Sequence, residues 1–132
     1  MNNLIYIAGP ITNGGTAGPK ETFDNIRRAM LIYGVLIDKG YAPILPHFSY
    51  FYWLHSDEPR MSHSDWLKLD FNYIRECDYF YYMEPEYYGD AKGAKTELKL
   101  ATQLHKIIFN HENAEDVPSY PFEPKSLRMA EV

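Results

Sequence analysis

At 132 residues, 45% of them apolar, the chain is long enough for one domain with a single hydrophobic core. Its 13 basic and 18 acidic residues leave a net charge of −5, which disfavours DNA or RNA as a partner because polymer binding depends on cationic contacts to phosphates. The one cysteine, Cys77, leaves no internal disulfide or thiolate zinc cluster, and no apolar run reaches roughly 18 residues, the length of a membrane span.

Four short apolar segments alternate with helical patterns along residues 3–110. The first, Asn3–Gly9, is almost continuously apolar, which is typical of a strand buried on both faces. Further strands are predicted at Tyr41–Pro46, Asp78–Met83 and Lys106–Asn110. This alternation predicts βαβ units, so we expect an α/β fold: a single-domain, flavodoxin- or Rossmann-like parallel sheet of about four or five strands with helices on both faces.

Helical spacing fills the segments between these strands. The first helix is predicted to run from Pro19, which suits a first helical position, to Gly40, which suits a left-handed C-terminal cap. Two further helices are expected at about Ser64–Cys77 and Gly89–Lys106. Along the first helix, apolar residues recur at helical spacing: Phe23, Ile26, Met30, Tyr33 and either Leu36 or Ile37.

Two segments lack the apolar periodicity of a helix or a strand. Residues 47–64 are expected to form a long connection that contains an aromatic stretch, Tyr50–Trp53. This stretch is compatible with a stacking wall, a lid or an oligomer contact, but a structural role is favoured. Residues 1–110 form the predicted domain, and the proline-containing residues 111–132 are expected to form an extended C-terminal tail that is free to pack on a neighbouring subunit.

Two acidic side chains fall on the apolar sides of the predicted helices. At roughly 100° per residue, Glu97 and Asp70 each lie opposite the polar stripe of their own helix. A single acid of this kind is equally compatible with a structural hydrogen-bond acceptor. Burying two carboxylates without an inward Lys or Arg costs free energy of folding. In enzymes that cleave glycosidic bonds, one acid of such a pair is an ionised nucleophile or base and the other is a proton donor.

Position along each helix predicts which acid has which role. Glu97 lies near the start of its helix, where the helix dipole favours an anion. Asp70 lies in mid-helix among apolar residues, where desolvation is expected to raise its pKa. We therefore predict that Glu97 is the nucleophile and Asp70 the proton donor.

A loop rich in glycine and proline follows the first predicted strand. Its backbone N–H groups are candidates for phosphate binding, although an ordinary tight loop explains the pattern equally well. It matches neither the dinucleotide fingerprint nor the P-loop, so NAD and ATP are not indicated. The candidate ligand-binding residues of this loop are Gly9, Pro10, Ile11, Thr12, Asn13, Gly14 and Gly15.

The histidines do not predict a metal site. His47, His55 and His63 are too far apart for a helical metal pair, so we expect no metal, and no organic cofactor is indicated. His47 opens the loop after the second predicted strand, at the sheet edge where parallel α/β folds bind ligands. We therefore predict that it lines the ligand cleft.

The stretches "IYIAGPITNGG", "DFNYIRECD" and "AKGAKTE" occur in an order and spacing that resemble a known family. Over residues 3–110 the chain resembles the nucleoside 2-deoxyribosyltransferase superfamily, including its 2'-deoxynucleoside 5'-monophosphate N-glycosidase relatives. The resemblance implies a flavodoxin-like sheet and a homodimer or higher homo-oligomer whose neighbouring subunits complete each active site. It also implies cleavage or transfer at the bond between a nucleobase and C1' of the sugar, through a covalent glycosyl-enzyme ester.

The resemblance assigns roles by position. Glu97 matches the family's nucleophile, Asp70 the acid that contacts the base, and Tyr6 a tyrosine whose hydroxyl holds the nucleophile. The loop Gly9–Gly15 matches the segment near the sugar and, in nucleotide-cleaving members, near its phosphate. The two acids are thus reached by helical periodicity and by resemblance.

One position departs from the family pattern. Six residues before the nucleophile, transferases tend to carry Asp and nucleotide hydrolases Ser, whereas this chain carries Ala91. Asp90, Ala91 and Gly93 are therefore substrate-binding candidates, and the choice between nucleoside and 5'-monophosphate stays open. Ala91 also leaves open a non-catalytic nucleotide-binding or sensing protein of the same fold. A tyrosine-rich interaction module with structural acids is a third alternative.

The expected partners and location follow from these observations. We expect a small nucleoside or nucleotide as ligand, and neither a nucleic-acid polymer nor a membrane as partner. The N-terminus lacks a basic segment that leads into an apolar signal core, so we expect a cytoplasmic protein.

Overall fold

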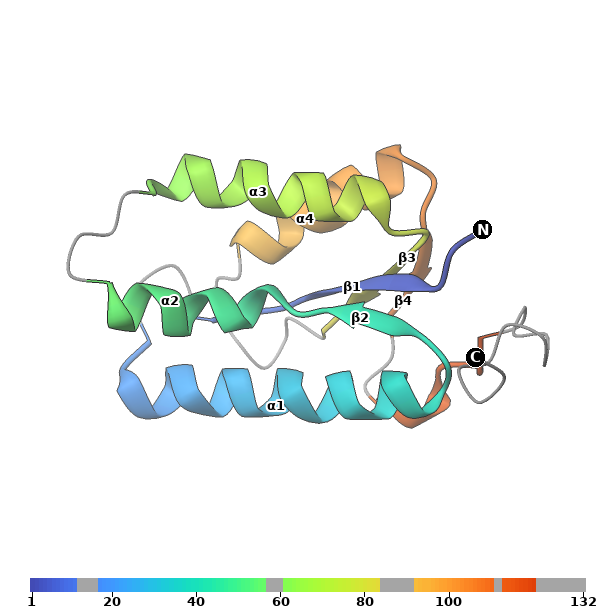
Figure 1. The fold of residues 1–132 in the computed structure, drawn as a ribbon, viewed down its shortest axis with the longest axis horizontal. Coiled ribbons are helices and arrows are strands. Elements are labelled where there is room, and N and C mark those ends of the chain that lie inside the picture. Colours follow the sequence, from blue (N-terminus) through green and yellow to red (C-terminus); the bar gives the residue numbers. More distant parts are fainter. Residues whose placement is uncertain (12–16, 57–60, 84–91, 111–112, 121–132) are drawn as a thin grey trace, which may run out of the picture.

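The computed structural model describes residues 1–11, 17–56, 61–83, 92–110 and 113–120. Its sheet consists of four parallel strands in the order β2-β1-β3-β4: β1 (Leu4–Ala8), β2 (Ala42–Ile44), β3 (Tyr79–Tyr82) and β4 (Ile107–Phe109) (Figure 1). The described helices are α1 (Pro19–Asp38), α2 (Ser49–His55), α3 (His63–Glu76) and α4 (Lys92–Gln103). The predicted α/β fold with a parallel sheet is confirmed, and the strand order begins as in flavodoxin-like folds. Within the described residues, no helix is both long and apolar enough to span a membrane.

Helices cover both faces of the sheet, and the side chains of its two central strands alternate between them. Figure 1 shows α1 on one side of the strands and α3 and α4 on the other. The face towards α1 is formed by Ile5, Ile7, Tyr79 and Tyr81. The face towards α3 and α4 is formed by Tyr6, Ala8, Phe80 and Tyr82. Because both faces are covered, β1 is buried almost throughout, as its continuous apolar run predicted.

The ends of α1 agree with the prediction, but only part of its apolar pattern is buried. The helix begins at Pro19, and Gly40 follows its end in the left-handed conformation with a φ of 94°. Of the apolar residues that recur at helical spacing, Ile26 and Leu36 are buried, whereas Phe23 and Met30 are 46% and 47% exposed. The residues that are buried are Thr22, Asn25, Ile26, Ala29 and Leu36. Apolar residues occupy more of the circumference of α1 than the sheet can cover, so the period alone does not say which of them are buried.

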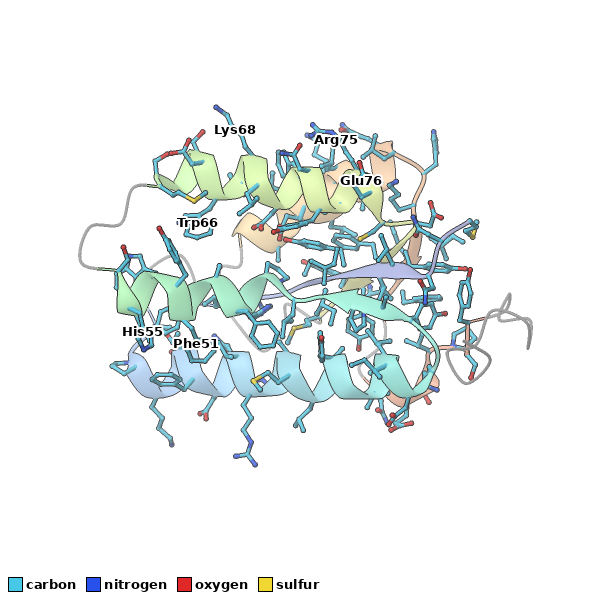
Figure 2. All side chains as sticks on the ribbon, in the orientation of Figure 1. Phe51, His55, Trp66, Lys68, Arg75 and Glu76 are labelled. Carbon is cyan, nitrogen blue, oxygen red and sulfur yellow. The ribbon has the colours of Figure 1, made fainter. Side chains whose placement is uncertain are left out.

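The predicted long connection over residues 47–64 is wrong in its first part. A 3-10 helix, η1 (Pro46–Phe48), leads directly into α2. Tyr50 of α2 contacts Phe23 of α1, and Tyr52 of α2 contacts Trp66 of α3, each with ring centroids 6.0 Å apart. Figure 2 shows Trp66 pointing from α3 towards α2. Since α2 contacts helices on two sides, its aromatic residues follow no single helical stripe.

Residues 113–120, which we expected to belong to an extended tail, pack against the α1 side of the sheet. They include a second 3-10 helix, η3 (Ala114–Asp116), and the buried Val117. The Tyr120 N–H donates to the Lys39 carbonyl over 2.8 Å, and the Tyr41 hydroxyl donates to the Pro118 carbonyl over 2.9 Å. This segment therefore contributes to the core of its own chain.

Candidate active site

Tyr6, Asp70 and Glu97 meet on the sheet face that α3 and α4 cover. Tyr6 lies in the middle of β1 and is fully buried, and its hydroxyl donates a hydrogen bond to Oε2 of the buried Glu97. Asp70, on α3, is half-buried and interacts with both of the others. The two carboxyl groups that helical periodicity turned inward therefore lie together, although they come from different helices.

Local sequence explains how α4 places Glu97 at the sheet. Ala94 and Ala101 lie one turn before and one turn after Glu97, and both are buried. Their small side chains let the helix backbone lie close to β1 and β3, so the longer Glu97 side chain reaches Tyr6. The Tyr6 ring stacks on Phe80 of β3, with centroids 5.7 Å apart and an interplanar angle of 15°, which fixes the direction of its hydroxyl.

A capping box fixes the start of α3, which carries Asp70. The Ser62 side chain accepts from the Asp65 N–H, and the Asp65 carboxylate accepts from the Ser62 N–H over 2.9 Å. Lys68 and Arg75 point away from the sheet (Figure 2). Asp70 is consequently held on the inner side of α3, while the basic residues of this helix face solvent.

The two carboxyl groups share a proton near neutral pH. Burial, and to a lesser extent the negative charge of Asp70, raise the pKa of Glu97 to about 8. Burial also raises the pKa of Asp70 to about 6, against the opposing effect of hydrogen bonds with Glu97 and Tyr6. The pKa of Tyr6 lies well above its usual value because of burial and both carboxyl groups, so its hydroxyl remains a donor. Glu97 is the more deeply buried of the two, and its pKa is raised further above its ordinary value than that of Asp70.

The structure describes only some of the predicted ligand-binding residues of the loop after β1 and of the start of α4. A Cβ atom added to Gly9 would lie 2.3 Å from Sδ of Met83, so this glycine permits close packing between the ends of β1 and β3. Pro10 is buried and Ile11 half-buried. Gly93, in the first turn of α4, has open space around it. Six predicted ligand-binding residues lie outside the described residues: Thr12, Asn13, Gly14, Gly15, Asp90 and Ala91.

His47 does not line an open cleft, so that prediction is wrong. The side chain is fully buried, and its Nε2 atom lies 3.0 Å from the Pro10 carbonyl oxygen. Sequence reasoning missed a second buried polar residue, Asn25, whose Nδ2 donates to the Ile11 carbonyl over 2.9 Å. The available signal was its position on α1, where it shares a helical side with the buried Ile26 and Ala29.

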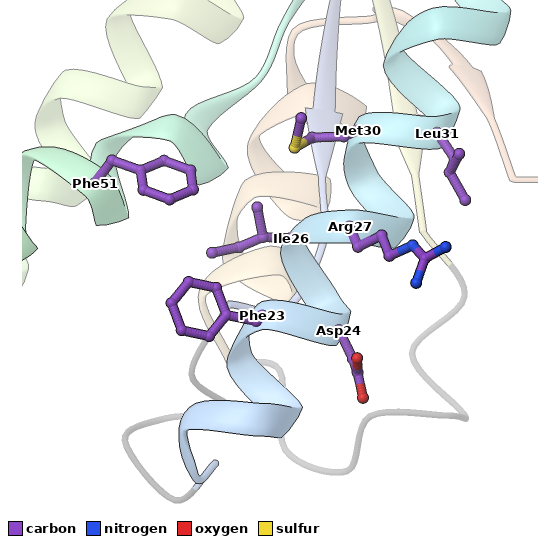
Figure 3. Close-up of a pocket in the computed structure, with 7 residues that line it drawn as sticks. All are labelled: Phe23, Asp24, Ile26, Arg27, Met30, Leu31 and Phe51. Atoms are coloured by element: carbon purple, nitrogen blue, oxygen red, sulfur yellow. The ribbon is translucent and has the colours of Figure 1, made fainter.

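A hollow of about 530 Å³ lies between α1 and α2, away from the acid pair (Figure 3). It is lined by Phe23, Asp24, Ile26, Arg27, Met30, Leu31 and Phe51. None of these residues contributes to the contact of Tyr6 with the two acids, and α1 covers the opposite face of the sheet. The hollow is therefore separate from the candidate active site.

Comparisons with known proteins agree with the fold. No match is found among curated proteins. Among solved structures, the chain is similar to the 2-desoxiribosyltransferase from Leishmania mexicana, with a TM-score of 0.53 and 20% sequence identity. The similarity covers 82% of this chain and 63% of that one, and at this identity it shows a shared fold. A family model described as "Domain of unknown function (DUF4406)" matches residues 3–110, and the chain belongs to this family.

Proposed function

We propose that this protein breaks the N-glycosidic bond of deoxynucleosides or of their 5'-monophosphates and passes the sugar to water or to a second base. The observation that carries the proposal is the buried contact among Tyr6, Asp70 and Glu97. The fold shared with a 2-desoxiribosyltransferase supports the choice of substrate class.

The shared proton prepares the acid pair for the first step. When the proton is on Asp70, Glu97 is an ionised nucleophile and Asp70 is an acid beside it. The Tyr6 hydroxyl donates to the Glu97 carboxylate and so stabilises its negative charge. A bound substrate that displaces water from the site also strengthens these interactions.

The first step exchanges one bond at C1' for another. A Glu97 carboxylate oxygen bonds to C1' while the bond from C1' to the base nitrogen breaks. The electron pair of the broken bond stays with the base, which takes the proton from Asp70. The products are the free base, an ionised Asp70 and a glycosyl ester on Glu97.

The second step restores both acids. Water or a second base bonds to C1', and the ester oxygen leaves with its electron pair as the Glu97 carboxylate. Asp70 accepts the proton that the incoming water or base loses. Hydrolysis and transfer differ only in which acceptor reaches the ester.

The decisive experiment measures free base released from deoxynucleosides and from their 5'-monophosphates, with and without a second base. We expect release by the wild-type protein and a loss of about 10³-fold or more in Glu97→Gln. Glu76→Gln is the matched control, because it makes the same change at an exposed position. Full activity in Glu97→Gln would refute the proposed nucleophile.

A non-catalytic nucleotide-binding protein is the second candidate, and one observation favours it. The raised pKa of Glu97 leaves much of this group protonated and non-nucleophilic at neutral pH in the free protein. Stabilisation by deoxynucleotides in a thermal-shift assay, without release of base under any acceptor condition, would support this candidate over the enzyme.

A further inference from the structure

Two buried side chains hold successive carbonyl groups of the backbone that leaves β1. His47 of η1 contacts the Pro10 carbonyl, and Asn25 of α1 contacts the Ile11 carbonyl. Both side chains are fully buried, and they come from different segments of the chain. The backbone beyond β1 is thus fixed at two consecutive peptide groups.

The hydrogen bonds of Asn25 fix the orientation of its amide group. Arg28 Nη2 lies 2.6 Å from Oδ1 of Asn25, and a guanidinium group can only donate. The oxygen of the Asn25 amide must therefore face Arg28, which leaves Nδ2 to donate to the Ile11 carbonyl over 2.9 Å. This contact is a true donor–acceptor pair.

The same reasoning fixes the tautomer of His47. A carbonyl oxygen can only accept, so the 3.0 Å contact with Pro10 requires a proton on Nε2. Burial lowers the pKa of His47 to about 4, which keeps the ring neutral, and Nδ1 is then an acceptor. Among the described residues, this buried Nδ1 has no hydrogen-bond partner. Fold stability alone would favour an apolar residue here, because an unpaired buried acceptor is destabilising.

The direction of the held carbonyl has a consequence for the loop. In a trans peptide group the C=O and the next N–H point in opposite directions, so the Pro10 contact turns the Ile11 N–H away from His47. Pro10 and Ile11 lie just beyond the carboxyl end of β1, the strand that carries Tyr6, and open parallel sheets bind their ligands beyond these strand ends.

We propose that His47 and Asn25 are positioning residues that hold the Pro10 and Ile11 carbonyls and thereby set the position of the Pro10–Ile11 backbone beside the substrate. The inference rests on the proposed function for the identity of that substrate. Neither side chain touches the reacting atoms. Both act through the backbone that they hold.

The test compares variants that remove the donor with one that retains it. His47→Phe keeps a buried ring without a donor, Asn25→Leu keeps the volume without a donor, and His47→Gln keeps an N–H near the original Nε2. Leu36→Ala is the control, because Leu36 is buried at the other end of α1. All five proteins, including wild type, are assayed well below their unfolding temperatures.

Two readouts are measured on each protein. Hydrogen exchange of the peptide that contains Ile11 is expected to accelerate about five- to tenfold in His47→Phe and Asn25→Leu, since each loses about one hydrogen bond to this segment. The KM for the deoxynucleoside or deoxynucleotide is expected to rise by a similar factor, with kcat changed less than about threefold. His47→Gln is expected to restore both values, and Leu36→Ala is expected to change neither.

The outcomes separate this inference from the proposed function. If exchange at Ile11 is the same in wild type, His47→Phe and Asn25→Leu, the two side chains do not hold this backbone and the inference is overturned. Faster exchange with an unchanged KM also overturns it, because the position of the Pro10–Ile11 backbone then has no effect on the substrate. If wild type releases no base, the proposed function fails, while ligand affinity from the thermal-shift titration replaces KM as the second readout.

Discussion

The two faces of the sheet bury their polar side chains in opposite ways. On the α1 side, His47 and Asn25 are neutral, and each is matched to a backbone carbonyl. On the α3 and α4 side, Asp70 and Glu97 would both be negatively charged when ionised, so the two carboxyl groups compete for one proton. Apart from Nδ1 of His47, which has no partner among the described residues, these neutral groups are hydrogen-bonded and cost the fold little, whereas two crowded acids oppose it more strongly. A catalytic role would explain why the fold tolerates two crowded acids, so this difference favours the α3 and α4 face as the place of the proposed reaction.

The largest expected effect comes from removing Asp70, the proposed proton donor. We expect Asp70→Asn to slow base release by about 10²- to 10⁴-fold, because the leaving base can no longer be protonated. With a deoxyriboside whose leaving group departs without protonation, the Asp70→Asn variant should lose much less activity. Rates are measured with both substrates, and Asp24→Asn, an exposed acid of α1, is the control. Equal losses with both substrates would show that Asp70 is not the proton donor.

Glu97→Gln is expected to increase the stability of the folded protein at alkaline pH. The folded pKa of about 8 lies above the ordinary 4.5, so the folded state binds more protons in this window and loses stability as pH rises from 4.5 to 8. A glutamine does not titrate, and we expect a gain in the free energy of unfolding of about 2–4 kcal/mol at pH 8. Urea unfolding at pH 5 and pH 8 measures this gain.

The control for that measurement is Glu76→Gln, which should behave like wild type. If the wild-type protein is as stable at pH 8 as at pH 5, the acid pair does not oppose folding. The contrast between the two faces would then be lost.

His47 is expected to give the opposite dependence on pH. Its folded pKa of about 4 lies below the ordinary 6.5, so its contribution to stability is complete above pH 6.5 and is lost as pH falls towards 4. The expected loss is about 3 kcal/mol across this window. In His47→Gln this acid-side loss should be absent, as measured by urea unfolding at pH 4.5 and pH 6.5. His55→Gln, at an exposed position, should retain the loss, and an identical pH dependence in all three proteins would contradict the assignment.

The smallest expected effect concerns the helix that carries Asp70. Ser62→Ala removes one half of the capping box of α3 and should lower the free energy of unfolding by about 1 kcal/mol. Because the cap lies two turns before Asp70, we expect kcat to stay within about twofold of wild type. Thermal unfolding and base release are measured together, with Ser64→Ala as the control. A large loss of kcat in Ser62→Ala would show that the acid pair depends on the first turn of α3.

Local pattern in the sequence determined the elements and much of the orientation of the acids. Continuous apolar runs predicted buried parallel strands, and Pro19 and Gly40 marked the ends of α1 because their backbone preferences are local. The helical period turned Glu97 and Asp70 inward for the same reason, since it depends only on the spacing of residues along one helix. The predicted roles of these acids in a reaction remain predictions.

Only the tertiary structure decided what those side chains meet. The buried side of α1, the bridging position of α2, the contact of His47 with Pro10 and the relative proton affinity of Glu97 and Asp70 all depend on segments far away in the chain. Desolvation is set by every neighbour around a group, whichever part of the chain supplies it. Helical period reports the direction of a side chain, but the depth at which it is buried is a property of the packed fold.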